Sequence, residues 1–381
     1  MKLELYIHIP FCVRKCNYCD FLSSPADRGT QEAYMAALFS EVAGRAAEYR
    51  KYKVTSVFIG GGTPSVVEVR WMVQLMEFLR EHFCLSEDAE ITIEVNPGTV
   101  DAEKLKAYYD AGINRLSIGL QSAKDEELKR LGRIHTFRQF LETYETARAA
   151  GFENINVDVM SALPGQTLKS YRETLQKVLA LTPPPEHISA YSLIVEEGTP
   201  FADWEREGCL DVPDEDCERR MYEETKQILE EAGFQRYEIS NYARKGFACR
   251  HNLGYWQRVD YAGFGIGAAS LIKNVRFSNN RDLQKYLENP LGQRSEVQVL
   301  SVAEQMEEFM FLGLRMTQGV NVESFRQNFG HTLAEVYGEV IGKNVREGLL
   351  FYHTSGKFLA LTKRGLDVSN YVMAQFLFDA D

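Results

Sequence analysis

Residues 3–19 read LELYIHIPFCVRKCNYC, a strand-like segment that runs directly into a cysteine-rich loop. In its first half, Leu3, Leu5, Ile7 and Ile9 alternate with polar or aromatic residues, which predicts a β-strand with two different faces. Pro10 cannot donate to a sheet ladder and is expected to end this strand. The cysteines that follow are therefore expected just beyond the carboxyl end of a strand.

The same strand-then-helix pattern repeats along the first two hundred residues. Each predicted strand is a short apolar or β-rich run, and helical segments separate the strands. The predicted strands cover residues 3–9, 54–59, 90–95, 114–120, 154–159 and 187–193. Six βα units in series predict a parallel sheet with right-handed crossovers. We expect an α/β fold, an open partial (βα)6 barrel rather than a doubly wound sheet, because two further units do not follow cleanly.

The pattern changes after Pro200. A helix is predicted over residues 214–232, followed by an aromatic- and Gly-rich stretch over residues 249–267. Further helices are predicted over residues 302–316, 322–329 and 333–347, and a hairpin over residues 349–361. These features predict an α+β C-terminal region with a winged-helix-like unit. We divide the chain into a partial barrel at 1–200, an extension at 201–300 and a small helical domain at 301–381.

Composition excludes several classes of protein. The 381 residues carry 43 Lys plus Arg and 54 Asp plus Glu, and the net charge of −11 argues against a non-specific grip on nucleic acid. No apolar run approaches the roughly 18 residues that a spanning helix needs. The first residues alternate and include an acid, unlike a signal or transit peptide. We therefore expect a cytoplasmic protein whose thiols stay reduced.

Three of the seven cysteines, Cys12, Cys16 and Cys19, fall within eight residues. Three thiolates on a short loop can hold three corners of a cubic iron–sulfur cluster, whereas ordinary electron-transfer clusters take four. Three ligands leave one iron open, and an open position is typical of a reactive rather than a structural metal site. The alternative is a zinc loop completed by a residue such as His8, although structural zinc sites more often combine two distant cysteine pairs.

The CxxxCxxC loop after this strand closely resembles the radical S-adenosylmethionine (SAM) superfamily. The resemblance implies a [4Fe-4S] cluster on Cys12, Cys16 and Cys19, with SAM chelating the open iron through its amino and carboxyl groups. The residue before the third cysteine, Tyr18, would lie by the adenine, and Tyr6 on the preceding strand belongs to the same predicted site.

Further SAM contacts are implied at the carboxyl ends of the later strands, where such folds place their sites. The GGTP segment at residues 61–64 would contact the ammonium group of SAM, and polar residues of the following βα units would complete the site. The residues that match are Gly61, Gly62, Thr63, Glu94, Gln121, Arg133 and Asp158.

Within the superfamily, nearly the whole chain is similar to the HemN-related branch. The matching segments are IHIPFC (7–12), NRLSIG (114–119), LPGQT (163–167) and EISNYA (238–243). This branch contains oxygen-independent coproporphyrinogen III dehydrogenases and heme chaperones. The dehydrogenases have a fourth cysteine two residues beyond the third, where this chain has Phe21, and a longer N-terminal extension. Both departures favour the heme-chaperone subgroup.

Residues 251–256 read HNLGYW, and this HNxxYW pattern resembles the heme-binding motif of that subgroup. The resemblance implies that His251 ligates heme iron and that Asn252, Tyr255 and Trp256 complete the contact, because a neutral imidazole is a common haem ligand and aromatic rings cover a porphyrin face. Cys249 is a second candidate ligand, since thiolates also bind haem iron.

We therefore expect a heme chaperone that passes heme to an apo-hemoprotein, with no catalytic residue assigned. The acceptor could be membrane-bound, and a homodimer is left open. One rival is a radical SAM tetrapyrrole oxidoreductase, which would use the same cluster and SAM contacts. Another is a plain iron–sulfur electron carrier, against which the three-cysteine loop and the Gly60–Pro64 turn both argue.

Overall fold

The structure, a computed structural model, describes residues 1–292 and 294–378. Its first half is a curved parallel sheet in which six strands neighbour one another in chain order, as predicted. These strands are β1 (Lys2–Ile9), β2 (Lys53–Gly61), β3 (Leu85–Val95), β4 (Arg115–Gln121), β5 (Ile155–Ser161) and β6 (His187–Ser192). The open partial barrel is confirmed.

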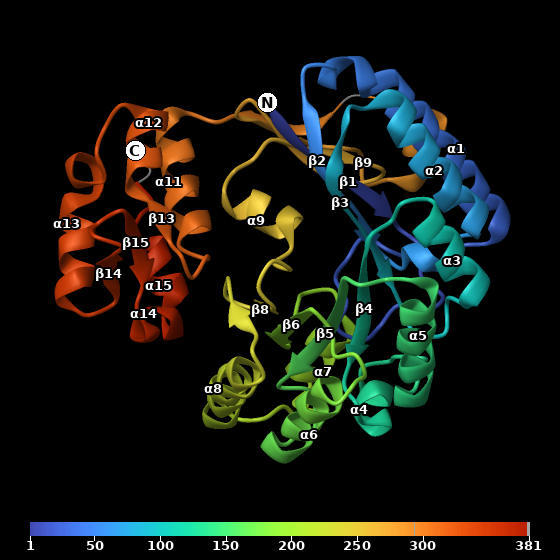
Figure 1. The fold of residues 1–381 in the computed structure, drawn as a ribbon, viewed down its shortest axis with the longest axis horizontal. Helices are drawn as coiled ribbons and strands as arrows, with labels where there is room; N and C mark the ends of the chain where they lie inside the picture. The colour runs from blue at the N-terminus through green and yellow to red at the C-terminus, as the bar shows by residue number, and fades with distance from the viewer. Residues whose placement is uncertain (293, 379–381) are drawn as a thin grey trace.

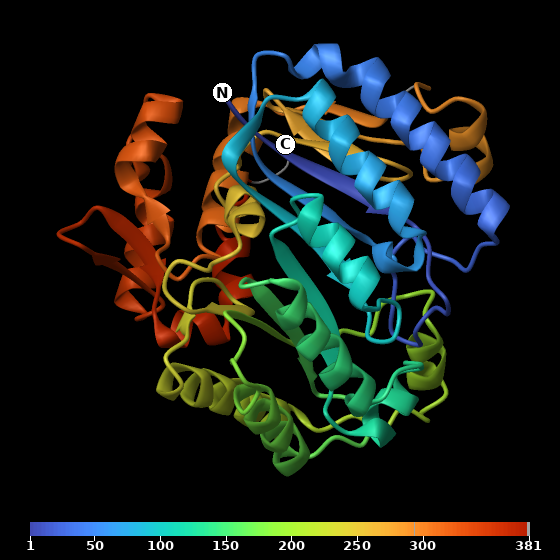
Figure 2. The ribbon, with the colours of Figure 1, turned by 45° about the vertical axis from the view of Figure 1, so that its right-hand side comes forward.

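Helices cover the outer face of this sheet, where the blue to green helices lie side by side (Figure 2). They are α1 (Arg28–Arg45), α2 (Val69–His82), α3 (Ala102–Asp110), α4 (Asp125–Arg130), α5 (Phe137–Ala150) and α6 (Leu168–Leu179). The side chains of Leu3, Leu5, Ile7 and Ile9 are fully buried in the core that these helices share with the sheet. The opposite face of β1, which strand alternation gives to the polar and aromatic residues, lines the inside of the barrel.

Four further strands extend the sheet beyond β1, and the sequence pattern did not predict these four strands. Strand β9 (Tyr261–Phe264) pairs in parallel with β1, and three antiparallel strands follow it to that edge of the sheet. These are β10 (Ala269–Ile272), β11 (Val275–Ser278) and β12 (Ser295–Val299). At the other edge, β8 (Asn241–Ala243) and β7 (Gln235–Arg236) follow β6. Strand β1 is therefore an inner strand, flanked on both sides.

Four helices lie along the chain between β6 and β12. They are α7 (Pro200–Arg206), α8 (Glu215–Glu231), α9 (Arg250–Trp256) and α10 (Leu283–Glu288). Helix α9 carries the HNxxYW residues and lies between the sheet and the C-terminal region (Figure 1). It contacts β2 on one side and α11 on the other.

Residues beyond 300 have a hydrophobic core of their own, built around Met310, Phe325 and Leu359. Its helices are α11 (Val302–Gly313), α12 (Val322–Phe329), α13 (Leu333–Arg346), α14 (Lys363–Asp367) and α15 (Ser369–Ala374). The predicted hairpin is present as β14 (Leu350–His353) and β15 (Phe358–Leu361), joined by β13 (Val320–Asn321). The helical and β character of this region is confirmed, whereas the three domain boundaries remain a prediction. Among the described residues, no helix is long and apolar enough to cross a membrane.

Candidate cluster site and a second cavity

The cysteine loop follows β1 and is held at its base and in its middle. Its start is bridged by backbone hydrogen bonds from Ser24 to Pro10 and from Cys12 to Ser24. Its middle is held by Asn17, whose side-chain amide donates to the Arg130 carbonyl at 2.9 Å. The loop is therefore a fixed platform at the carboxyl end of the sheet.

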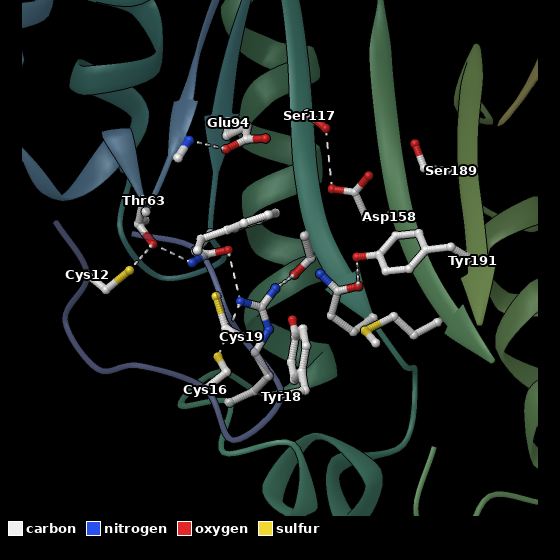
Figure 3. Close-up of a pocket in the computed structure, with 18 of the residues that line it drawn as sticks. Cys12, Cys16, Tyr18, Cys19, Thr63, Glu94, Ser117, Asp158, Ser189 and Tyr191 are labelled. Atoms are coloured by element: carbon white, nitrogen blue, oxygen red, sulfur yellow. Dashed lines mark hydrogen bonds between the residues drawn. The ribbon is translucent and has the colours of Figure 1, made fainter. Parts of the chain in front are cut away.

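Cys12, Cys16 and Cys19 are unpaired, partly buried thiols that line one cavity of about 500 Å³. Figure 3 shows their sulfurs on the same side of the cavity, facing the side chains of the strands. Thr63 Oγ1 donates to Cys12 Sγ at 3.6 Å, and Arg133 Nη1 lies 3.9 Å from Cys16 Sγ. The three thiols thus share one polar environment.

The GGTP turn brings backbone into close contact with the cysteine loop. Gly62 donates its N–H to Ile9, and a Cβ there would lie 2.6 Å from the Phe11 carbonyl oxygen. Gly61 has φ of 114° and donates its N–H to Glu94 Oε2 at 3.0 Å. Glycine is needed at both positions, for space at the first and for conformation at the second.

The predicted SAM-contacting residues converge on this cavity with one exception. Tyr18, Gly61, Gly62, Thr63, Glu94, Gln121, Arg133 and Asp158 all line it, as does Asn252 from the HNxxYW segment. Tyr6 lies outside it and lines a different cavity. The arrangement of the strand residues across the cavity is visible in Figure 3.

Several lining residues were missed by the sequence analysis, including Asn96, Arg115, Ser117, Ser189 and Tyr191. Most of them lie two positions from a predicted residue or on the same inward face of β4, β5 or β6. The signal that could have found them is the period of two along each parallel strand.

Burial shapes the electrostatics of the cavity. Desolvation, and then the nearby Asp158 carboxylate, raises the pKa of Glu94 to about 8. Desolvation also raises the pKa of Cys19, and the neighbouring Cys16 and Cys12 thiols raise it further. Three crowded thiolates are costly unless a cation accompanies them, and iron supplies that charge. The donor set and its electrostatics therefore fit an iron–sulfur cluster.

Among the described residues, no three His, Cys, Asp or Glu side chains gather as tightly as a single-ion site requires. The spacing of the three cysteines suits a cluster better, because a [4Fe-4S] cluster binds each thiolate to a different iron. His8, the candidate fourth zinc ligand, has both ring nitrogens in hydrogen bonds, with the Tyr6 hydroxyl at 3.0 Å and the Leu22 carbonyl at 2.9 Å.

A second cavity, of about 490 Å³, lies beside the first, on the side of β9 and β10. Aromatic and small apolar residues make up most of its wall, and two arginines also line it. Its lining includes Tyr6, His8, Phe21, Tyr255, Trp256, Tyr261, Arg276 and Arg281. Tyr255 and Trp256 of the HNxxYW segment thus line the second cavity, while Asn252 lines the first.

His251 lines neither cavity and is only 2 % exposed. Its Nδ1 lies 2.8 Å from Ser56 Oγ and its Nε2 lies 3.1 Å from the Tyr255 hydroxyl. Burial, together with the charge of Arg115, lowers the pKa of His251 to about 3. The imidazole is therefore neutral and fully hydrogen-bonded.

Two structural features separate the cavities. One is the pair Tyr6 and Phe58 on adjacent strands, whose rings stack at 6.5 Å. The other is the segment directly after the third cysteine, since Asp20 and Phe21 line both cavities. The position where the resembled dehydrogenases have a fourth cysteine is therefore part of a shared wall.

Comparison with known proteins identifies the family of this chain. Residues 6–178 match the radical SAM superfamily and residues 300–368 match the HemN C-terminal domain. The curated protein "Heme chaperone HemW" of Lactococcus lactis is 37 % identical, covering 98 % of this chain and 97 % of that protein. The protein of the same name from Bacillus subtilis is 38 % identical, covering 98 % of each.

Among solved structures, the chain is similar to the Escherichia coli coproporphyrinogen III oxidase HemN, described as a radical SAM enzyme. The TM-score is 0.85 at 24 % identity, over 98 % of this chain and 89 % of that one. This structural similarity establishes the fold, and the sequence similarity to full-length HemW proteins establishes the family. The chain belongs to the HemW family of the radical SAM superfamily.

Proposed function

We propose that this protein is a heme chaperone, which binds heme and transfers it to an apo-hemoprotein. The observation that carries the proposal is the similarity to proteins named heme chaperone over essentially the full length of both chains. Phe21 in place of a fourth cysteine agrees with it.

In this proposal Cys12, Cys16 and Cys19 would hold a [4Fe-4S] cluster, whose open iron would bind SAM. The cluster, when bound, supplies a site for SAM and an electron store. The chain's own groups would orient SAM: the GGTP turn beside its ammonium, Tyr18 by its adenine, and the polar residues of the strands around the rest. Those polar residues are Glu94, Gln121, Arg133 and Asp158.

Arg133 has the clearest positioning role in this arrangement. Its Nη2 donates to the Gly119 carbonyl at 2.7 Å and its Nη1 to Asn96 Oδ1 at 3.2 Å. These bonds fix the guanidinium beside the Cys16 thiol. A fixed cation at this place is suited to a carboxylate of a ligand or to the thiolates of the cluster.

Heme would bind beside the HNxxYW segment, comprising His251, Asn252, Tyr255 and Trp256. The second cavity is the space that this segment helps to line. Its aromatic wall suits a porphyrin face, and its arginines suit the carboxylates at the porphyrin edge. We further propose a cytoplasmic location, an apo-hemoprotein partner that could be membrane-bound, and a homodimer as a form to be tested.

The test combines heme binding, heme transfer and turnover in one preparation. Anaerobically reconstituted protein is titrated with ferric heme by absorbance, then mixed with apomyoglobin, and coproporphyrinogen conversion is followed in a parallel sample. We expect stoichiometric heme binding and transfer to apomyoglobin without porphyrinogen conversion. Absent transfer from the fully loaded protein, or conversion of coproporphyrinogen, would overturn the proposal and favour the tetrapyrrole oxidoreductase.

A further inference from the structure

His251 and Tyr255 form a hydrogen-bonded pair on α9, yet only Tyr255 reaches the second cavity. The His251 ring is stacked on Phe58 at 5.2 Å, and its other nitrogen is bound to Ser56. For His251 to meet a ligand in the cavity, it would have to leave both hydrogen bonds. Tyr255 needs no such change, because it is already part of the wall.

Cys249, the other candidate ligand of the HNxxYW region, is also turned away. Its side chain is fully buried, and its thiol lies 3.4 Å from Glu90 Oε1. Cys249 lines neither cavity.

The second cavity has the chemistry of a site for a flat, largely apolar molecule with carboxylates at one edge. Its volume lies within the usual range for ligand pockets. Tyr255 and Tyr261 meet edge to face at 4.7 Å, which keeps both rings in place. Arg281 is exposed and has no carboxylate partner among the described residues, whereas Arg276 is held by Glu308 at 2.7 Å.

We propose that the second cavity is the heme site and that Tyr255, rather than His251, supplies the axial ligand, with His251 as its positioning residue. This inference rests on the proposed function and makes its site specific. Tyrosine oxygen is an established haem ligand.

Proton balance follows from the same contacts. When the Fe(III)–O bond forms, the O–H bond of Tyr255 breaks and its proton passes to His251 Nε2, 3.1 Å away. The other ring nitrogen of His251, Nδ1, faces Glu4, whose Oε2 lies 3.7 Å away and has no hydrogen-bond partner among the described residues. Burial raises the pKa of Glu4 to about 9, so this group is a neutral carboxyl group that can accept a hydrogen bond.

A second Tyr–His pair in the same cavity, Tyr6 with His8, lacks this arrangement. The far ring nitrogen of His8, Nε2, lies 2.9 Å from the Leu22 carbonyl oxygen, whereas the far ring nitrogen of His251 faces the Glu4 carboxyl group. Tyr261 is hydrogen-bonded to Arg276, which cannot accept a proton. Among the three tyrosines of the cavity, Tyr255 alone is backed by a proton acceptor with a carboxyl group behind it.

The experiment compares ferric heme spectra and affinities of the full-length protein and single variants, by absorbance and electron paramagnetic resonance. Tyr255→Phe removes only the hydroxyl, and Tyr6→Phe and Tyr261→Phe are matched controls in the same cavity. We expect a phenolate-ligated, high-spin spectrum in the wild type and in both controls. In Tyr255→Phe this signature should be lost and the affinity should fall about tenfold or more. His251→Gln should keep the phenolate signature with altered band positions.

The outcomes separate the two proposals. Wild type that binds no heme would end the proposed function and this inference with it. Heme bound with an imidazole signature that vanishes in His251→Gln but survives in Tyr255→Phe would overturn this inference alone. So would loss of the phenolate signature in Tyr6→Phe. Reconstitution of the iron–sulfur chromophore in each variant shows that it has folded.

Discussion

Gly254 is the point where α9 rests on the sheet, and its replacement by alanine is a direct test of that docking. A Cβ at Gly254 would overlap the carboxyl group of Glu4, with all three of the nearest atoms far inside the 3.4 Å where ordinary contact begins. Glu4 is 3 % exposed and cannot swing into solvent. Either the helix must lift from the strand or the carboxyl group must leave its place.

The expected magnitude is the balance of two effects. Overpacking of a tight core costs roughly 1–3 kcal/mol. Replacing a helical glycine by alanine stabilises the helix by about 1 kcal/mol, because alanine has the higher helix propensity. Gly254→Ala should therefore lower the free energy of unfolding by up to about 2 kcal/mol, and heme affinity should fall because the helix carries Tyr255 and Trp256.

Gly342→Ala is the matched control, since this mid-helix glycine of α13 faces only the flexible end of Arg346 at 3.4 Å. It should stabilise the protein by about 1 kcal/mol and leave heme binding unchanged. Both variants are followed by denaturant unfolding with circular dichroism and by heme titration. In a Glu4→Ala background the penalty of Gly254→Ala should disappear. Equal stabilisation by the two alanines, with heme affinity unchanged in both, would refute the docking of α9 on Glu4.

Three further predictions test other parts of the molecule. Cys16→Ser should abolish the cluster chromophore and leave heme binding largely intact, whereas the exposed Cys84→Ser should change neither; loss of both in Cys16→Ser would contradict a two-site protein. Glu90 Oε1 accepts a hydrogen bond from the first N–H of α9 at 2.9 Å. Glu90→Gln should therefore weaken heme binding, measured by titration, by about 1 kcal/mol. An unchanged affinity would argue against this helix cap. Burial lowers the pKa of His135 from 6.5 to about 3, so the unfolded chain takes up the proton first as pH falls. Between pH 6.5 and about 3, this histidine alone should lower the unfolding free energy by at most about 1.4 kcal/mol per pH unit. The curve of His135→Gln should therefore be shallower than that of the wild type by this amount, and parallel curves would disprove the prediction.

Local pattern predicted the six strands of the barrel because each is a short β-rich run beside a Gly or Pro turn. The same pattern also located most of the first cavity. Glu94, Gln121 and Asp158 lie far apart in the chain, yet parallel strands bring their carboxyl ends to one edge.

The second cavity could not be predicted in this way. Its far wall comes from β9, β10 and β11, strands of only four residues each. Of these, β9 pairs with β1 across more than 250 positions, and β10 and β11 follow it in the sheet. The polar residues Glu4 and His8 have the pattern of an exposed strand face, and they are buried because α9 and the β9–β10 turn cover them. The direction in which His251 points depends on Ser56, which the motif alone does not reveal.

Asp20 and Phe21 form a wall that is common to the two cavities, so a ligand in one cavity contacts the same residues as a ligand in the other. Whatever occupies the cysteine cavity touches one side of this wall, and whatever occupies the aromatic cavity touches the other. Linkage between two such ligands is reciprocal: if filling one site changes the affinity of the second by some factor, filling the second changes the first by the same factor. In the proposed function, Phe21 is therefore a side chain through which SAM and heme would change each other's affinity.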